Sequence, residues 1–303
     1  MNNLWIKYGG KILSMDASEV VTEVLKSKKY SSIDEKMVNR IALEMSKRYK
    51  KKKDIIKAVK KELHIIHGLF LHDDCHFISN EMLLKEADRK GSISNMQLSE
   101  SIMNLHSSTQ ERLNEAKEIY SFIGQFIESD FAIMDIGCGF NPFSIPFYEA
   151  EPKNYIAYDI NADTIKLINS YFDLIEKPSY HAEIFDVILT TPNIFANTVF
   201  LLKLLPLIEQ QKKGRVTSLL EELKFDTAII SFPLKSVTGK QKGMEMFYSS
   251  FMENNLPLSL KIADKMCFSN ELFFVLKNIP IVDIKKDSQR FNDFSMSLRA
   301  KNK

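Results

Sequence analysis

The stretch MDIGCGFNP, Met134–Pro142, includes the end of a predicted strand and the loop that follows it. The strand is expected over Ala132–Ile136, whose apolar composition is that of a buried strand. Gly137 and Gly139 allow the backbone to take positive φ angles and to approach a ligand closely, while Pro142 suits the first turn of a helix. In open α/β sheets, ligands bind in the loop that follows such a strand. The dinucleotide fingerprint G-x-G-x-x-G would need glycine at position 142, so the pattern predicts a ligand without a pyrophosphate.

Three carboxylates are spaced along this part of the chain. Asp135 precedes the glycines, Asp159 ends a predicted strand, and Asp186 ends the next one. Asp159 can accept hydrogen bonds from both ribose hydroxyls, and Asp186 can accept one from the adenine amino group. Asp135 is expected to hydrogen-bond the turn itself. Such a set repels a diphosphate but tolerates the positive sulfonium of S-adenosylmethionine, which is the cofactor that the spacing predicts.

Working outward from this turn, short apolar segments alternate with helical patterns from Phe131 onward, which is typical of an α/β fold whose parallel sheet is covered on both faces. A further helix is expected within residues 101–127, capped near Ser107 or Ser108. Later helices are expected over residues 164–175 and 216–224. Strands are predicted over residues 132–136, 155–159, 182–187, 198–203, 228–232, 260–267 and 272–276.

The first hundred residues have a different character. Apolar residues at helical spacing, such as Ile33, Met37 and Ile41, predict a bundle of amphipathic helices from residue 16 to about residue 104. Residues Lys26–Lys61 include 14 basic and four acidic residues. Their local net charge is +10, in a chain whose net charge is +2. Such a surface suits a phosphate backbone, although a solvated helix face gives the same pattern. The densest run is Lys50, Lys51, Lys52 and Lys53.

The composition, with 45% hydrophobic and 26% charged residues, is that of a globular protein. Cys75, Cys138 and Cys267 are scattered and form no C-x-x-C pair, which excludes a disulfide framework and a cysteine zinc site. The start has no signal-peptide core, and no apolar run reaches the ~18 residues that span a bilayer. We therefore expect a soluble, cytoplasmic protein. No metal site is expected either, because the spacing of the clustered residues does not keep them on one helix face: His64, His67, His72, Cys75 and His76.

The motifs that the sequence lacks reduce the number of atoms that could accept the methyl group. The N/D-P-P-Y/F loop of amino-nitrogen methylation does not follow the fourth predicted strand, where the sequence is KLLP, residues 203–206. Carbon-5 methylation of pyrimidines needs a cysteine nucleophile, and Cys138 is better placed as a small packed residue of the turn. What remains is an atom that already carries a lone pair, such as guanine N7. Its methylation requires in-line positioning without a general base.

The sequence resembles one family, on five stretches: LHSSTQERL (105–113), MDIGCGFNPFSIPF (134–147), YIAYDI (155–160), FLLKLLPLIE (200–209) and ISFPLKSVTGKQKGME (230–245). They are similar to the aminoglycoside-resistance 16S ribosomal RNA guanine-N7 methyltransferases, the Arm/Rmt/Sgm group, over roughly residues 16–278. The resemblance implies a Rossmann-like class I S-adenosylmethionine-dependent methyltransferase fold with a seven-stranded sheet. It also implies two domains: a helical rRNA- and ribosome-binding domain (1–104) and a methyltransferase domain (105–279). The tail (280–303) has no counterpart in the family, and its polar composition predicts that it is flexible.

The resemblance further implies the roles of individual residues. Arg112 would grip the methionine carboxylate, and Lys203 and Lys240 would act near the target base. RNA contacts would come from Lys235 and Lys242 together with the run Lys50–Lys53. Asn197 departs from the pattern, because many members carry aspartate there, before the fourth strand. The implied cofactor residues are Phe70, His106, Ser107, Ser108, Arg112, Gly137, Asp159, Asp186, Val187, Leu202 and Gln211.

The implied activity is methyl transfer from S-adenosylmethionine to guanine N7 in the decoding A-site of 16S rRNA. The implied substrate is the assembled 30S subunit, and the enzyme is expected to be a monomer that uses neither DNA nor a membrane. Methylation would add a positive charge and remove a hydrogen-bond acceptor where an aminoglycoside binds, giving resistance. Two alternatives stay open: a small-molecule methyltransferase, which would not depend on the basic helices, and a non-catalytic ribosome-binding protein, which would not bind the cofactor.

Overall fold

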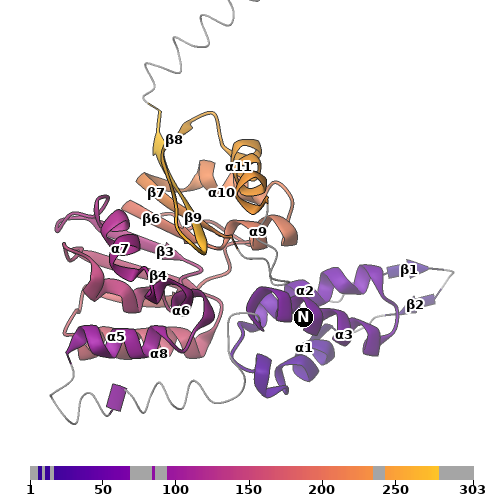
Figure 1. Cartoon of the computed structure of the whole chain (residues 1–303). Coiled ribbons are helices and arrows are strands. Elements are labelled where there is room, and N and C mark those ends of the chain that lie inside the picture. The colour runs from indigo at the N-terminus through magenta and orange to yellow at the C-terminus, as the bar shows by residue number, and fades with distance from the viewer. Residues whose placement is uncertain are drawn as a thin grey trace, which may run out of the picture. The chain divides into compact units, whose positions relative to one another are not determined.

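The computed structural model of the 303-residue chain describes residues 6–8, 11–13, 17–68, 84–85, 94–234 and 243–279. Of residues 6–8, 11–13 and 67–68 it describes the backbone alone. The chain divides into two compact units: unit 1 comprises residues 1–130 and 134–186, and unit 2 comprises residues 131–133 and 187–303. Seven strands form a mixed sheet in the order β5-β4-β3-β6-β7-β9-β8, which confirms the predicted α/β class (Figure 1).

The first part of unit 1 is helical. A two-stranded antiparallel ribbon, β1 (Ile6–Tyr8) and β2 (Lys11–Leu13), precedes α1 (Ala17–Leu25), the short 3-10 helix η1 (Lys28–Tyr30), α2 (Glu35–Arg48) and α3 (Lys52–Leu63). A single π-type turn, η2 (His64–Gly68), continues α3.

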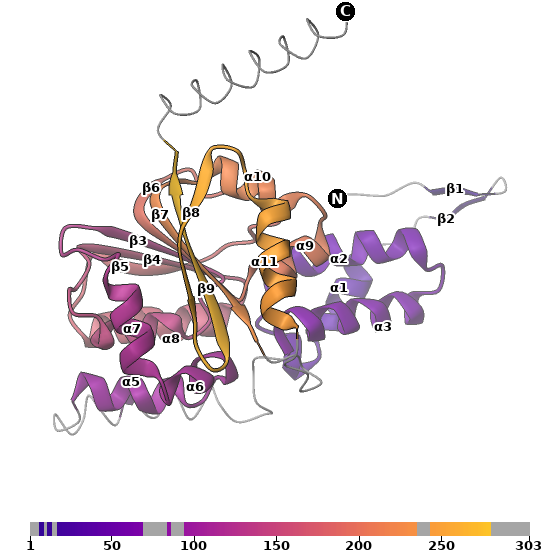
Figure 2. The same cartoon turned by 45° about the horizontal axis from the view of Figure 1, so that its top comes forward.

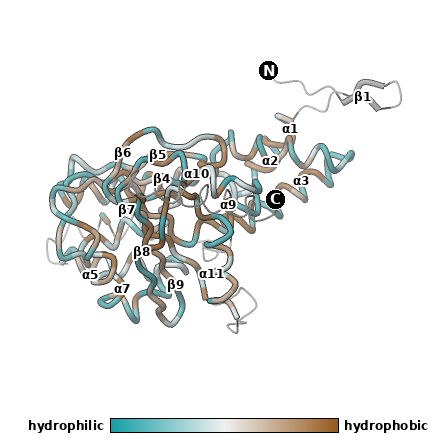
Figure 3. The backbone as a smooth tube through the Cα atoms, turned by 90° about the horizontal axis from the view of Figure 1, so that it is seen from above, coloured by the Kyte–Doolittle hydropathy of each residue, from teal (hydrophilic) through white to brown (hydrophobic). Residues whose placement is uncertain are grey.

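The helices α1, α2 and α3 pack through the apolar positions that the helical spacing predicts. Val24, Val38, Ile55 and Val59 are fully buried in one cluster. Along α2 and α3 the backbone alternates between hydrophobic and hydrophilic residues (Figure 3), as expected for helices that bury one face. Tyr30 spans the cluster and donates a hydrogen bond from its hydroxyl to the carbonyl of Lys60 at 3.1 Å.

Within the described residues 94–130, unit 1 carries the helices α5 (Asn95–Met103), α6 (Ser107–Leu113) and α7 (Ala116–Gly124). A helix does begin at Ser107, but its N-cap is His106, whose side chain makes no capping hydrogen bond, so the predicted serine cap is wrong. The predicted continuation to residue 127 is wrong as well. Glu115 leaves the helical region, with φ −125° and ψ 23°, so that α6 ends and α7 starts anew.

The sheet portion of unit 1 runs from β3 (Ala132–Ile136) through the 3-10 helix η3 (Asn141–Phe147), β4 (Asn154–Asp159) and α8 (Ala162–Leu174) to β5 (Tyr180–Ile184). Helices α5 and α8 lie side by side (Figures 1 and 2), where the hydroxyls of Ser99 and Tyr171 are 3.1 Å apart. β4 and β5 are parallel.

The third predicted strand is wrong at its end. β5 stops at Ile184, the last residue paired with β4, and the next amide, that of Phe185, donates to the carbonyl of Asp159 at 2.9 Å. Because β4 itself ends at Asp159, the ladder has no partner beyond this point. Asp186 therefore lies in the loop after β5, two residues beyond the strand.

Unit 2 contains β6 (Phe195–Leu202), α9 (Leu205–Gln211), α10 (Arg215–Glu222), β7 (Lys224–Pro233), α11 (Met244–Asn255), β8 (Leu260–Cys267) and β9 (Glu271–Asn278). β6 and β7 are parallel, whereas β9 runs antiparallel to both β7 and β8. In Figure 2 the β8–β9 hairpin stands beside α11. The ring of Phe232 on β7 stacks on that of Tyr248 on α11, with centroids 4.7 Å apart.

Two further expectations for unit 2 need correction. The helix expected over residues 216–224 ends at Glu222, because Lys224 already belongs to β7. Asn197 lies inside β6 and not before it. Its side chain accepts from the Ala132 amide at 2.9 Å and donates to Asp226 at 3.1 Å, so it ties β6 to the neighbouring segments. Within the described ranges, no helix is long and apolar enough to cross a membrane, and no group of metal-binding side chains is assembled.

Candidate functional site

The glycine turn between β3 and η3 has the geometry that the sequence predicts. Gly137 and Gly139 take φ angles of 65° and 49°. A Cβ on Gly139 would lie 3.4 Å from the imidazole of His106, so the position has little room for a side chain. The His106 ring stacks on Phe140 with centroids 4.8 Å apart, and its Nδ1 lies 2.8 Å from the hydroxyl of Ser108. The start of α6 therefore packs directly against the turn.

Asp159, at the end of β4, organises the neighbouring loops. Its Oδ2 accepts from the Gly139 amide and its Oδ1 from the Asn161 amide, each at 3.0 Å. The side chain remains partly exposed. A carboxylate offers about four lone-pair sites, so these two bonds leave acceptor capacity for ribose hydroxyls.

Arg112 belongs to a buried polar network that the sequence does not reveal. Its guanidinium donates to the Asn141 side-chain oxygen at 3.0 Å, and the Asn141 amide donates to Asp135 Oδ2 at 2.9 Å. The Tyr155 hydroxyl donates to the same oxygen at 2.7 Å. All of these residues are buried. Asn141 thus holds Arg112 on α6 and Asp135 on β3 in one arrangement beside the glycine turn.

Asp135 is the carboxylic acid of this network. It is fully buried, and this burial raises the pKa of its carboxyl from 3.8 to about 6, although the bonds from Asn141 and Tyr155 and the charge of Arg112 act in the opposite direction. Its second oxygen, Oδ1, has no hydrogen-bond partner. A buried carboxylate oxygen without a hydrogen-bond partner is unusual in a folded protein. The position of Oδ1 therefore fits a site in which a cationic ligand supplies the missing partner.

Asp186 is held by the helical part of unit 1. Arg40 on α2 donates from Nε to Asp186 Oδ2 at 3.0 Å, and the Asp186 side chain is only 3% exposed. No sequence signal pointed to Arg40, because the partners are 146 positions apart. A second contact lies nearby in the chain: the loop before α2 forms a bridge between Ile33 and Asn161, directly after Asp159.

In unit 2, Val187 and Lys203 have partners that the sequence likewise does not reveal. Buried Arg215 donates from Nε to the carbonyl of Val187 at 3.0 Å. Lys203, directly after β6, takes a left-handed φ of 55° and is 6% exposed. Its ammonium lies 3.5 Å from buried Glu271, so Lys203 forms an ion pair with the first residue of β9.

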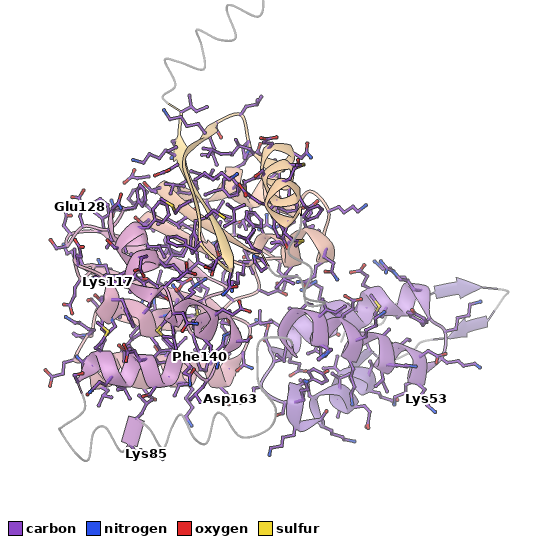
Figure 4. All side chains as sticks on the ribbon, in the orientation of Figure 1. Lys53, Lys85, Lys117, Glu128, Phe140 and Asp163 are labelled. Carbon is purple, nitrogen blue, oxygen red and sulfur yellow. The ribbon has the colours of Figure 1, made fainter. Side chains whose placement is uncertain are left out.

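The remaining predicted residues fall in three groups. Ser107 begins α6, while Leu202 ends β6 as a buried residue and Gln211 ends α9 half-buried. The run Lys50–Lys53 is exposed at the start of α3 (Figure 4 labels Lys53), with Lys52 paired to Glu19 at 2.6 Å. Phe70, Lys235, Lys240 and Lys242 lie outside the described residues.

Unit 1 thus brings together the glycine turn, His106, Ser108, Arg112 and the carboxylates at 135 and 159, linked through Asn141 and direct hydrogen bonds. These hydrogen-bonding groups fit a nucleoside that carries an amino acid substituent. Carboxylate acceptors suit hydroxyls and ammonium groups, and a guanidinium suits a carboxylate. A pyrophosphate would meet acids in the place where it needs donors.

Comparison with known proteins agrees with this chemistry. The family described as ribosomal RNA methyltransferase (FmrO) matches residues 26–275. The chain is 30% identical to a 16S rRNA (guanine(1405)-N(7))-methyltransferase of Proteus mirabilis, over 86% of this chain and 97% of that protein. It is also 30% identical to a protein of the same name from Serratia marcescens, over 87% and 99%.

A solved structure is similar over most of the chain. The 16S rRNA methyltransferase RmtF, crystallised in complex with S-adenosyl-L-homocysteine, superimposes with a TM-score of 0.79 at 29% identity, covering 88% of this chain and 100% of the other. The α/β sheet is therefore that of a class I methyltransferase with an N-terminal helical region. With a glycine turn, a nucleoside-type acceptor set and a family match over most of its length, the chain belongs to the FmrO family of ribosomal RNA methyltransferases.

Proposed function

We propose that this protein methylates N7 of a guanine in the decoding A-site of 16S rRNA, with S-adenosylmethionine as methyl donor, and thereby confers aminoglycoside resistance. The observation that carries the proposal is the Asp159 carboxylate, which is fixed by the Gly139 and Asn161 amides in a chain that matches rRNA methyltransferases over residues 26–275. The assembled 30S subunit is the proposed substrate. A monomeric, cytoplasmic enzyme is proposed with it.

The cofactor would be held by groups of different charge. Asp159 would accept the ribose hydroxyls and Asp186 the adenine amino group, while Arg112 would pair with the methionine carboxylate. The orphaned Oδ1 of Asp135 offers an acceptor for the methionine ammonium. The residues proposed to complete the site are Phe70, His106, Ser107, Ser108, Gly137, Val187, Leu202 and Gln211.

When bound, S-adenosylmethionine supplies a methyl group attached to a positive sulfur, which is an electrophile that needs no further activation. Guanine N7 has an available lone pair, so the chain's residues need to hold the two partners in line and to exclude water, and no general base is required. Methyl transfer would break the sulfur–methyl bond, leave its electron pair on sulfur and pass the positive charge to the guanine.

The basic groups have a different task. We propose that the exposed run Lys50–Lys53 on the 1–104 domain contacts rRNA phosphates, together with Lys235 and Lys242 of the 105–279 domain. Lys203 and Lys240 are proposed to act at the target nucleotide. Because the A-form major groove is deep and narrow, that guanine has to leave its stack to reach the cofactor. The tail, residues 280–303, is given no role in this step.

A methyl-transfer assay with tritiated S-adenosylmethionine tests the proposal. Separate reactions would contain purified 30S subunits, 50S subunits and protein-free 16S rRNA, and Asp159→Ala would serve as the inactive control. The expected result is label in 30S subunits alone, which Asp159→Ala removes. Label found only in a small-molecule fraction would support the small-molecule alternative. Binding to 30S subunits without any binding of S-adenosylhomocysteine would support a non-catalytic role.

A further inference from the structure

A largely shielded ion pair joins the helical region to Asp186, the residue proposed to accept the adenine amino group. Arg40 lies in the middle of α2, and its Nε donates to Asp186 Oδ2 at 3.0 Å. The side chains of Arg40 and Asp186 are 16% and 3% exposed, whereas those of Arg48 and Glu44, an ion pair on the same helix, are 64% and 39% exposed. A charge-assisted hydrogen bond this well shielded fixes both side chains, whereas the exposed pair contributes little.

The same helix is anchored at its start. The amide of Asp34 donates to the carbonyl of Ile160 at 3.0 Å, and the amide of Ala162 donates to the carbonyl of Ser32 at 2.7 Å. The Ser32 hydroxyl also bonds to Asp163 at the start of α8 (Figure 4 labels Asp163). The segment that receives these bonds follows Asp159 immediately. The loop before α2 and the middle of α2 therefore contact the chain next to Asp159 and at Asp186.

Asp186 has more than one acceptor position. A carboxylate has about four lone-pair sites, and the Nε bond from Arg40 takes one of them. The bond restricts the rotation of the carboxyl group, and an acceptor that is already oriented loses less entropy when the ligand binds. Loss of Arg40 would leave a nearly buried carboxylate without this cation and without this constraint.

We propose that Arg40 is a positioning residue for adenosine recognition: by orienting Asp186 it makes helix α2 part of the cofactor site, so that cofactor binding and the docking of α2 stabilise each other. The inference rests on the proposed function, since it takes Asp186 as the acceptor for the adenine amino group. Coupling of this kind is reciprocal, so a ligand that uses oriented Asp186 also holds α2 in place.

Calorimetry of the full-length protein with S-adenosylhomocysteine tests whether Arg40 supports cofactor binding. Arg40→Met removes the charge and the donors but keeps much of the aliphatic stem, and Arg48→Met makes the same change at the exposed pair of the same helix. We expect Arg40→Met to weaken binding at least tenfold and Arg48→Met to change it less than twofold. Arg40→Lys, which restores a cation without the fixed guanidinium geometry, should recover part of the loss.

A double-mutant cycle separates positioning from general damage. In an Asp186→Asn background, adding Arg40→Met should change the affinity for S-adenosylhomocysteine less than twofold, because the oriented carboxylate is already gone. The double variant also removes the buried charges together, so it remains informative if Arg40→Met alone folds poorly. An equally large effect of Arg40→Met in both backgrounds would overturn the proposal.

Hydrogen exchange tests whether cofactor binding stabilises the docking of α2. Addition of S-adenosylhomocysteine should slow amide exchange across α2, residues 35–48, in the wild type and in Arg48→Met, but not in Arg40→Met. Unchanged α2 exchange in the wild type, or wild-type affinity in Arg40→Met, would refute the inference. Failure of the wild type to bind S-adenosylhomocysteine would instead refute the proposed function, so the two failures are distinct.

Discussion

Asp135 shows how a single buried acid links the site to stability. Burial raises the pKa of its carboxyl from 3.8 to about 6, so between these pH values the folded state holds a proton that the unfolded state has lost. The stability that Asp135 contributes is therefore complete below about pH 4 and is lost as the pH rises through 6. The loss amounts to roughly 3 kcal/mol at neutral pH.

Asp135→Asn should remove this dependence. We expect the free energy of unfolding of Asp135→Asn, relative to the wild type, to rise by roughly 3 kcal/mol between pH 4 and pH 7. Urea unfolding at a series of pH values measures it. Parallel stability profiles for the two proteins would contradict the perturbed pKa.

Asp159 gives a second prediction at this scale. Asp159→Ala removes the acceptor proposed for both ribose hydroxyls, each bond to a charged acceptor being worth about 1.5 to 3 kcal/mol. Binding of S-adenosylhomocysteine should weaken by about a hundredfold or more. Asp173→Ala, an exposed acid on α8, is the matched control for loss of charge. Calorimetry that finds the same affinity in both variants would exclude the ribose role.

Among the elements, α5 starts at a capping box. Ser94 caps it by accepting from the Gln97 amide at 3.2 Å, and the Gln97 side chain accepts in return from the Ser94 amide at 3.3 Å. Ser94→Ala should therefore cost about 1 kcal/mol of stability. Ser101→Ala on the same helix removes only an exposed hydroxyl bond to a helix carbonyl and should be nearly neutral. Equal midpoints of urea unfolding for the two variants would contradict the cap.

The elements that the sequence predicts well are those specified locally. β3 and β8 have the predicted bounds, because each is bounded locally by a turn: β3 ends at the glycine turn, and β8 ends at the short connection to β9. The end of β5 was not predictable in this way, since it depends on the Asp159 carbonyl capturing the Phe185 amide. The break at Glu115 also went unpredicted, since no proline or glycine marks it.

The candidate site likewise contains residues that the local sequence predicts and residues whose contacts depend on the folded structure. The glycine turn and Asp159 follow from a short motif and the strand that comes next. Asn141 stands within that motif, yet its bridge between Arg112 and Asp135 needs α6 to pack on the turn. The pairing of Arg40 with Asp186 and of Lys203 with Glu271 joins residues far apart in the chain, so only the folded structure reveals it.

At the scale of the whole molecule, the charge distribution predicts how the protein meets RNA. Lys51 and Lys53 are exposed at the start of α3, and Lys117 is exposed on α7; Figure 4 labels Lys53 and Lys117. Replacing Lys51 and Lys53 by Gln should weaken binding to 30S subunits and lower the slope of log affinity against log salt by about two. Lys117→Gln should leave both nearly unchanged. A salt slope that is the same in all three proteins would show that this run does not contact phosphates.

The position of the methyl group tests the central claim most directly. N7-methylguanine makes its strand sensitive to borohydride reduction followed by aniline cleavage, so primer extension on 16S rRNA from treated 30S subunits locates it. The account predicts one new stop, at a decoding-site guanine, that requires both the wild-type protein and S-adenosylmethionine. A methyl group on another atom or another nucleotide, or no stop despite cofactor binding, would contradict it.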